Sequence, residues 1–388
     1  MTLDLDSAHA AFESSTDFTV GLEEEFALLD PSTLSMVPRY EDVRAAAAAD
    51  PVLAASAAGE LIASEIEIRS GRGADMHDAV VLQRDHRRRL FALARAEGIA
   101  LGATGTHPWS DYREQQIIDT DHYQRVQDGL RYVAWRNNTF SLHVHVGVRG
   151  ADRAVAACDR LRPVLPLLLA ISANSPYVDG RDSGLHSART QTFTKSFPRC
   201  GVPEVFGTWA DFAQYVRFLV QTNSIVEYTQ VWWSVRPHIS FGTVEMRICD
   251  AAATAGESEG LAALIVACVA QACRDHDEGR PAPAFLGGVA DVRGHLIEEN
   301  MWRAIRFGLD GRMIDFGSGD EFSSSEVVAR LLAWTEPMRA ELAIDPALPE
   351  LNGAQRQRRL IDAGVPMDEV YAGVVRETRD SYAQEVPA

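Results

Sequence analysis

The sequence predicts an α+β fold in which an antiparallel sheet is covered by helices on one face. Two observations support this class. Four short segments alternate apolar and polar residues with the period of two that a strand requires. Longer segments between and after them have the composition and boundary residues of helices. Strands and helices mixed in this way favour one sheet packed against helices.

The expected helices are recognised from their ends. Asp75 can cap a helix, Gly98 can stop it, and Pro163 and Pro166 are expected to kink another. Helices are expected over residues 40–49, 75–97, 153–173 and 258–276, and successive amphipathic helices from about Gly294 onward. The segment 175–207 has no firm period and many Gly, Pro, Ser and Thr residues, so we expect a functional loop that closes over a site.

The expected strands cover residues 18–29, 61–69, 140–148 and 242–249. Successive side chains of a strand point to opposite faces, so each of these strands has one aliphatic face. Glu24 is the exception, because it is an acid on the aliphatic face of the first strand. The aliphatic faces are expected to pack on the helices.

The opposite face of each strand carries ionisable groups two residues apart. They are Glu23 and Glu25, then Glu65, Glu67 and Arg69, then His143 and His145, and finally Glu245 and Arg247. In a shared sheet this face would collect carboxylates that repel one another unless countercharge is present. A mostly carboxylate set with one or two His suits Mg²⁺ or Mn²⁺. For a single strand a solvated polar face is the more common explanation, but four such strands together predict a metal–phosphate site.

Composition limits the class of protein. The 388 residues are 46% hydrophobic and 24% charged, which suits a folded protein. We expect a flexible segment over residues 1–17 and one folded domain over residues 18–388, whose C-terminal part is helical. The net charge of −18 argues against a nucleic-acid partner. No apolar stretch of membrane-spanning length and no signal peptide are expected. Five irregularly spaced cysteines suit free thiols in the cytoplasm.

The chain has a single lysine, Lys195. It therefore contains no G-x-x-x-x-G-K-[ST] motif and no kinase-type V-A-I-K strand. If ATP is bound, arginines and metal ions must hold its phosphates. Lys195 lies in the segment 175–207, and we do not place it in the site.

Five blocks in order resemble the signatures of the type 2 glutamate–cysteine ligase family, also called carboxylate-amine ligases. They are residues 21–26 (GLEEEF), 65–68 (EIEI), 142–147 (LHVHVG), 232–237 (WWSVRP) and 242–250 (GTVEMRICD). The resemblance implies a glutamine-synthetase-like catalytic fold, with a curved antiparallel sheet that forms a cleft and helices on its outer face. It also implies ATP and Mg²⁺ as cofactors, with Mn²⁺ as a substitute, small-molecule substrates, and a homodimer.

The reaction that the resemblance implies has two steps. The γ-carboxylate of glutamate attacks the γ-phosphate of ATP, and the amine of cysteine then attacks the acyl phosphate, which gives γ-glutamylcysteine, ADP and phosphate. By the same resemblance Glu23, His143 and Glu245 hold one metal, Glu25 and Glu67 hold another, and Glu60 is a further ligand. His145, Arg236 and Arg247 contact phosphates, and Arg189 and Arg247 act on the substrate and its transferred phosphoryl group. Arg69 and Ser70 depart from the family pattern, in which Asn and Thr are expected.

Several alternatives stay open at this point. Glutamate and cysteine are defaults, so a ligase with another carboxylate or amine is the nearest alternative. A guanidino-kinase-like phosphotransferase, a metallohydrolase and a non-catalytic binding protein are the others. Cys249 shares a face with Glu245 by alternation but lacks a positioned base, so we interpret it as a structural thiol. The run Arg87–Arg89 is interpreted as a solvated helix face.

Overall fold

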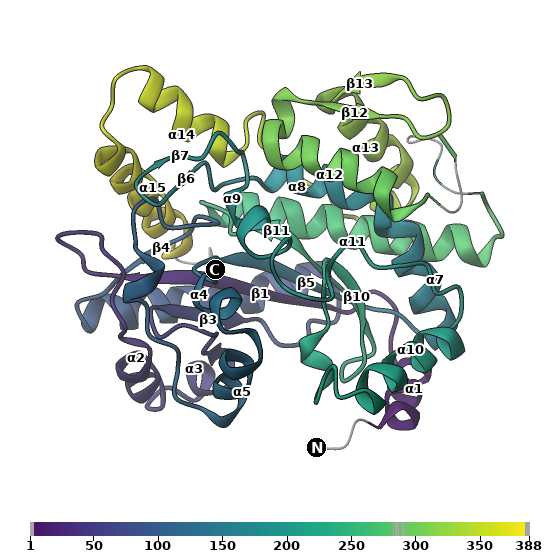
Figure 1. Cartoon of the computed structure of the whole chain (residues 1–388), viewed down its shortest axis with the longest axis horizontal. Coiled ribbons are helices and arrows are strands. Elements are labelled where there is room, and N and C mark those ends of the chain that lie inside the picture. The colour runs from purple at the N-terminus through teal and green to yellow at the C-terminus, as the bar shows by residue number, and fades with distance from the viewer. Residues whose placement is uncertain (1–3, 282, 284–286, 289–291, 385–388) are drawn as a thin grey trace.

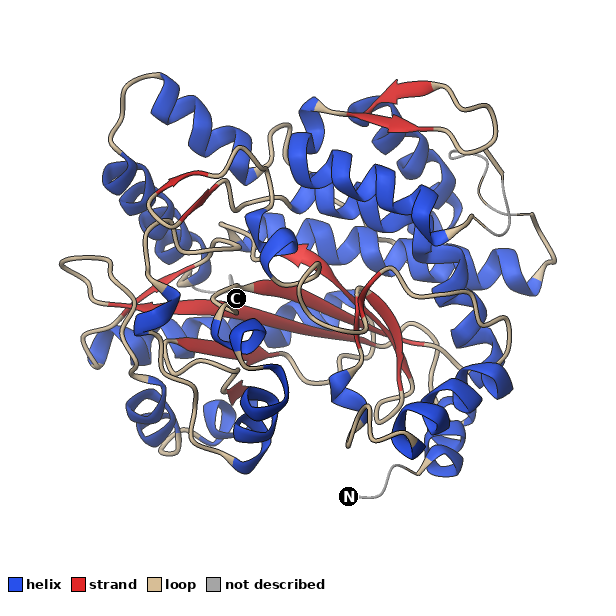
Figure 2. Ribbon diagram, viewed as in Figure 1, coloured by secondary structure: helices blue, strands red, loops and turns tan. Residues whose placement is uncertain are grey.

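A seven-stranded sheet runs through the middle of the molecule, and helices lie against it (Figures 1 and 2). The computed structural model describes residues 4–281, 283, 287–288 and 292–384. Six strands follow the order β10-β11-β5-β1-β3-β2, β4 pairs with β1, and every pair in this sheet is antiparallel. The expected α+β fold is therefore confirmed.

The four expected strands form the centre of this sheet. Its members are β1 (Val20–Leu29), β2 (Ala57–Ala58), β3 (Glu65–Arg69), β4 (Ala100–Gly102), β5 (Ser141–Gly147), β10 (Val235–His238) and β11 (Thr243–Asp250). Three two-stranded pairs lie outside it: β6 (Tyr177–Val178) with β7 (Arg181–Asp182), β8 (Cys200–Gly201) with β9 (Trp232–Trp233), and β12 (Arg312–Ile314) with β13 (Glu321–Ser323).

The α-helices of the described residues include all those expected. They are α1 (Leu5–Glu13), α2 (Tyr40–Ala47), α3 (Pro51–Ser56), α4 (Met76–Ala96), α5 (Asp121–Leu130), α6 (Tyr132–Trp135), α7 (Ala151–Leu161), α8 (Leu165–Ser172), α9 (Ala188–Thr192), α10 (Trp209–Gln221), α11 (Ala255–Asp277), α12 (Gly294–Phe307), α13 (Ser324–Glu341), α14 (Gly353–Asp362) and α15 (Met367–Tyr382). Asp75 caps α4 as predicted. A 3₁₀ turn at Arg162–Val164 separates α7 from α8, because Pro163 interrupts the helix there.

The N-terminal segment differs from the flexible segment expected over residues 1–17. Residues Leu5–Glu13 form α1, which Asp4 caps. Leu5, Ala8 and Phe12 are buried in the main core, and the Phe12 ring lies 5.5 Å from the ring of Trp209. The polar and acidic composition of this segment gave no sign of a packed helix, because only three residues of α1 face the core.

The aliphatic face of the sheet packs on helices, as predicted. Side chains of β1, β5 and β11 share one core with α7, α8 and α11, while α4 packs on β1 and β3. In the view of Figure 1, α8, α11 and α12 lie above the sheet, and α2, α3 and α5 lie below it. By length and composition α11 could cross a membrane, but 83% of its apolar window is buried, as in a core helix. This qualifies the expectation that no stretch has membrane-spanning length.

A buried ion pair explains the acid on the aliphatic face. Arg87 of α4 is fully buried and donates from Nε to Glu24 at 2.5 Å and from Nη1 to Glu259 of α11 at 2.8 Å. Gln83 adds a bond of 2.8 Å to Glu24. The interpretation of Arg87–Arg89 as a solvated face is therefore wrong for Arg87, which joins β1, α4 and α11. It holds better for Arg88, which is 42% exposed and pairs with Asp85.

A β-bulge interrupts the alternation of β11. Met246 pairs with Val144 and Cys249 pairs with Leu142, so β11 has one residue more than β5 across this interval. Cys249 consequently lies in the aliphatic core and not on the face of Glu245, which corrects the placement by alternation. Burial raises the pKa of the Cys249 thiol to about 12, as expected for a structural thiol.

Candidate active site

The polar faces of β1, β3, β5 and β11 meet in one cleft, because the strands pair in register. Glu23 lies opposite His143, and Glu25 lies opposite Glu67. His145 lies opposite Glu245. Directly opposed residues of antiparallel strands share a face, so the pairs predicted strand by strand form one continuous polar surface.

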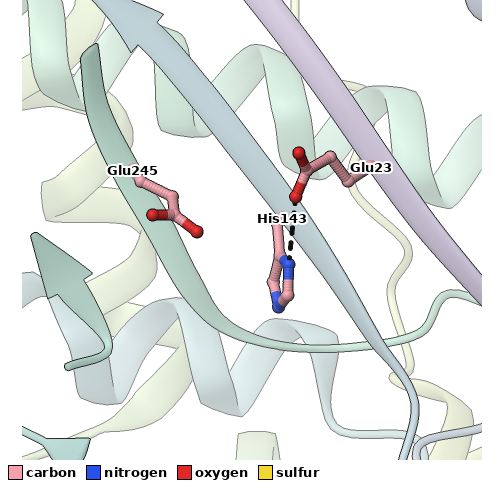
Figure 3. Close-up of side chains that lie close together, drawn as sticks. All are labelled: Glu23, His143 and Glu245. Atoms are coloured by element: carbon pink, nitrogen blue, oxygen red, sulfur yellow. Dashed lines mark hydrogen bonds and ion pairs between the residues drawn. The ribbon is translucent and has the colours of Figure 1, made fainter. Parts of the chain in front are cut away.

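Three of these side chains form the first group that could hold a metal ion. One ligand atom from each of Glu23, His143 and Glu245 lies within 4.8 Å of the others. Figure 3 shows the three side chains pointing toward one another from β1, β5 and β11. His143 Nδ1 lies 3.4 Å from a Glu23 oxygen. These are the three residues that the family resemblance assigns to one metal.

A second group of the same kind consists of Glu25, Glu67 and His143. Ser141 connects two of its members, because its hydroxyl donates to Glu25 at 2.6 Å and lies 2.8 Å from His143 Nε2. Glu60, which precedes β3, lines the same cavity as Glu25. The structure thus brings all six predicted metal ligands to one cleft.

The acids of the second group are crowded and buried. Burial raises the pKa of Glu67 well above its usual value, and the negative charges of Glu23, Glu60 and Glu25 raise it further. Burial and the charge of Glu25 likewise raise the pKa of Glu60 to about 8. Such a cluster is short of positive charge, and divalent cations would supply it. The oxygen-rich donor set with one imidazole fits Mg²⁺ or Mn²⁺.

The pKa values of the two histidines of β5 shift in opposite directions, although the residues are only two apart. Burial and the nearby Arg247 lower the pKa of His143, which favours the neutral imidazole that can ligate a metal. Burial opposes the charge of His145, but Glu23 and Glu245 outweigh it and raise the pKa of His145. The raised pKa favours the imidazolium form of His145.

Two arginines converge on Glu245. Arg236 of β10 donates from Nε to Glu245 at 2.5 Å and from Nη2 at 3.2 Å, and Arg247 forms an ion pair with the same carboxylate. Burial alone would raise the pKa of Glu245, but Arg236 and Arg247 hold it well below its usual range. Glu245 therefore fixes both guanidinium groups in the cleft.

Arg189 enters the cleft from α9, within the segment predicted to be a loop. Its guanidinium donates to the carbonyl oxygens of Ile248 and Arg247, each at 3.2 Å. Asp250 anchors this segment to the sheet, because it accepts from Ser175 at 2.6 Å and from Ser187 at 2.8 Å. The segment 175–207 thus contains β6, β7, α9 and β8, and it delivers Arg189 beside Arg247.

Arg189 and Arg247 each have one donor that is not used in a hydrogen bond. The Nε atoms of Arg189 and Arg247 are buried and have no hydrogen-bond partner among the described residues. Buried donors without partners are costly, so an anionic ligand would stabilise them. Both arginines line one cavity, which makes it a suitable place for a carboxylate or a phosphoryl group.

The polar surface opens into two cavities. The first, of about 220 Å³, is lined by Glu25, His143, Arg189 and Arg247 and by the aromatic side chains of Phe193, Phe197 and Trp232. The second, of about 730 Å³, is lined by Glu23, His145, Arg69 and Phe241. Within the first metal group, His143 lines the first cavity and Glu23 lines the second.

Some cavity residues were not singled out from the sequence. Glu65 was placed on the polar face but not in the site, and it lines the first cavity. His122, Tyr123, Asn137 and Thr139 also line it, and they come from a stretch with no recognisable motif. Lys195, which was not placed in the site, forms an ion pair with Glu298 of α12. Trp232 forms part of the wall of the first cavity.

The chain matches a known family along most of its length. The family described as glutamate–cysteine ligase family 2 (GCS2) matches residues 19–380. A provisionally named glutamate–cysteine ligase 2 of Solibacter usitatus is 35% identical over 373 residues, which cover 93% of this chain and 93% of the relative. A relative from Rubrobacter xylanophilus, provisionally named glutamate–cysteine ligase 2-2, is 36% identical over 376 residues, with 95% and 94% coverage.

Solved structures share the fold. A glutamate–cysteine ligase from Francisella tularensis, crystallised in complex with AMP, superposes with a TM-score of 0.65 at 11% identity and covers 95% of this chain and 91% of its own. A bifunctional glutathione synthetase from Pasteurella multocida also gives a TM-score of 0.65, at 13% identity, and this chain corresponds to 54% of it. At these identities the likeness concerns the fold alone.

Proposed function

Because the chain belongs to glutamate–cysteine ligase family 2 and is an ATP-dependent ligase, we propose that it joins the γ-carboxylate of L-glutamate to the amine of L-cysteine through a γ-glutamyl phosphate. One observation carries this proposal. The two groups of candidate metal ligands and the side chains of three arginines lie together in one cleft. Phosphoryl transfer to a carboxylate needs positive charge and alignment and no protein nucleophile.

Glu23, His143 and Glu245 would hold one Mg²⁺ ion, and Glu25, Glu67 and Glu60 another. Bound there, the metal ions would neutralise phosphate oxygens and align the phosphoryl group with the attacking carboxylate. His145, Arg236 and Arg247 lie around the same point and would contact the phosphates. Arg189 would face the substrate carboxylate or its phosphorylated form.

The sizes of the two cavities suggest where each substrate binds. The larger cavity, beyond Glu23 and His145, has the volume for a nucleotide. The smaller cavity, which contains Arg189 and Arg247, suits amino acids. With this arrangement the phosphoryl group would pass between the cavities at the first metal group. Positioning of this kind accounts for a large part of the rate enhancement in such enzymes.

The proposal is tested by ADP release. With ATP and Mg²⁺ present, full turnover is expected only when both glutamate and cysteine are supplied, and chelation of Mg²⁺ should stop it. Turnover with glutamate and a different amine would support a ligase whose acceptor is not cysteine. A stable phosphorylated product formed without any amine would instead indicate a guanidino-kinase-like phosphotransferase, and turnover of a substrate without ATP would indicate a hydrolase.

Replacement of Arg247 with lysine should separate catalysis from binding. Lysine keeps the charge but loses the planar donor fork, including the unpaired Nε. We expect kcat for ADP formation to fall about a hundredfold, or about 3 kcal/mol, with a smaller change in the KM for ATP. Arg312→Lys, on the β12–β13 pair away from the cleft (Figure 1), is the matched control and should behave like the wild type. A change in KM alone would make Arg247 a ground-state anchor.

A further inference from the structure

A histidine–glutamate pair lies at the first cavity, apart from both metal groups. His122, near the start of α5, lines the cavity together with His143, Arg189 and Arg247. Its Nδ1 lies 2.8 Å from an oxygen of Glu227, 105 residues further along the chain. The pair therefore joins α5 to the segment that leads into β9. The His122 and Glu227 side chains are 37% and 33% exposed, so the ring is accessible to a ligand.

The contact with Glu227 determines what the ring can do. A carboxylate next to Nδ1 favours the tautomer in which Nδ1 carries the proton, which leaves Nε2 as a proton acceptor. Glu227 also holds the ring in place, as a carboxylate does for a catalytic histidine. His143 and His145 are not available for this role, since both contact Glu23, His143 belongs to the metal groups and His145 is proposed to contact phosphate.

The chemistry of amide formation requires a proton acceptor in this cavity. An amino-acid amine is an ammonium group near neutral pH and has no lone pair for attack. The candidate metal ligands would be occupied by cations, and the arginines stay protonated. Among the described residues that line this cavity, His122 is the histidine outside the metal groups, and it has a carboxylate partner.

We propose that His122, oriented by Glu227, is the general base that deprotonates the acceptor amine. The inference rests on the proposed ligase function and adds a residue to it. Nε2 takes one proton from the ammonium group, and the freed lone pair forms the C–N bond to the acyl carbon. The C–O bond to the phosphate breaks, its electron pair leaves with the phosphate, and the second amine proton passes to the departing phosphate.

Several charged groups surround the pair. On α5, Arg125 lies 3.7 Å from Glu227, and the Tyr123 ring lies 4.8 Å from the His122 ring. From the β2–β3 side, Glu60 and Glu65 line the same cavity. Because a protonated imidazole cannot accept a proton, we expect turnover with cysteine to fall at low pH.

Hydroxylamine can replace cysteine as the acceptor and tests the role of the base. It is mostly unprotonated at neutral pH, so its attack on the acyl phosphate needs no general base. In His122→Gln we expect glutamate- and ATP-dependent turnover with cysteine to fall roughly a hundredfold. Formation of the hydroxamate with hydroxylamine should stay near the wild-type rate. The pH profile with cysteine should lose its His-dependent limb and follow deprotonation of the free amine instead.

Two further variants complete the test. Glu227→Gln removes the orienting carboxylate and should reduce turnover with cysteine less than His122→Gln does, with a shifted pH profile. His9→Gln is the matched control, since His9 pairs with Glu13 on the surface of α1 and should leave both reactions unchanged.

Each remaining outcome decides against the inference. Equal losses with cysteine and hydroxylamine in His122→Gln would give His122 a structural or binding role. Unchanged turnover with cysteine would give it no role. If the wild type releases no ADP with glutamate, cysteine and ATP, the proposed function itself fails, which distinguishes that failure from failure of the base.

Discussion

Replacement of Glu245 with glutamine is expected to lower ligase turnover about a thousandfold and to destabilise the fold by about 3 to 5 kcal/mol. Glu245 is fully buried and is shared by Arg236 and Arg247. Removal of its charge leaves two buried guanidinium groups without their counterion. It also removes a carboxylate from the first metal group, so turnover should become less responsive to added Mg²⁺.

Urea unfolding and ADP release measure the two effects on one variant. The exposed Glu336→Gln on α13 removes the same charge from the surface and should change neither quantity. Because loss of folding alone would also stop turnover, activity is compared under conditions where circular dichroism shows the variant to be folded. A folded Glu245→Gln variant with wild-type turnover and Mg²⁺ dependence would exclude the proposed mechanism.

The Arg87→Met variant should lose about 3 to 5 kcal/mol of folding free energy. Methionine fills much of the space but leaves Glu24 buried between β1, α4 and α11 without its cation. Glu24 would retain bonds from Gln83 and Ser258, which cannot replace a positive charge. The effect should appear as a lower urea midpoint with an unchanged slope, since the surface exposed on unfolding stays similar.

The neighbouring Arg88→Met variant is the control for that measurement. Arg88 lies one residue along the same helix and pairs with Asp85, but its side chain is 42% exposed. An exposed pair of this kind is worth little, so we expect a change within about 0.5 kcal/mol. Similar destabilisation in the two variants would mean that the packing of α4, and not the buried charge, determines the result.

Much of the site could be predicted because strand alternation is local. The i and i+2 spacing of Glu23 with Glu25, and of His143 with His145, was sufficient to place them on one face. The sheet then paired these strands in register. The resemblance added Glu60, Arg189 and Arg236, whose positions relative to the sheet depend on loops and could not follow from periodicity.

The remaining features depend on contacts between distant segments. The bulge in β11 moved Cys249 to the core because β5 pairs with one residue fewer, which the sequence of β11 alone does not reveal. Arg87 looked like a surface residue because its partners, Glu24 and Glu259, come from other elements. The partnership of His122 with Glu227 spans 105 residues and has no local signature.

The crowding of carboxylates in the cleft has a consequence for the encounter with substrate. A chain of net charge −18 is expected to repel free ATP, which is itself a polyanion, until the nucleotide reaches the arginines of the cleft. The nucleotide would therefore approach most readily as its magnesium complex, or after a cation has already entered the cleft. Salt screens such repulsion over about 10 Å at 0.1 M ionic strength, so moderate ionic strength should speed the capture of free ATP where it would slow capture by a basic cleft.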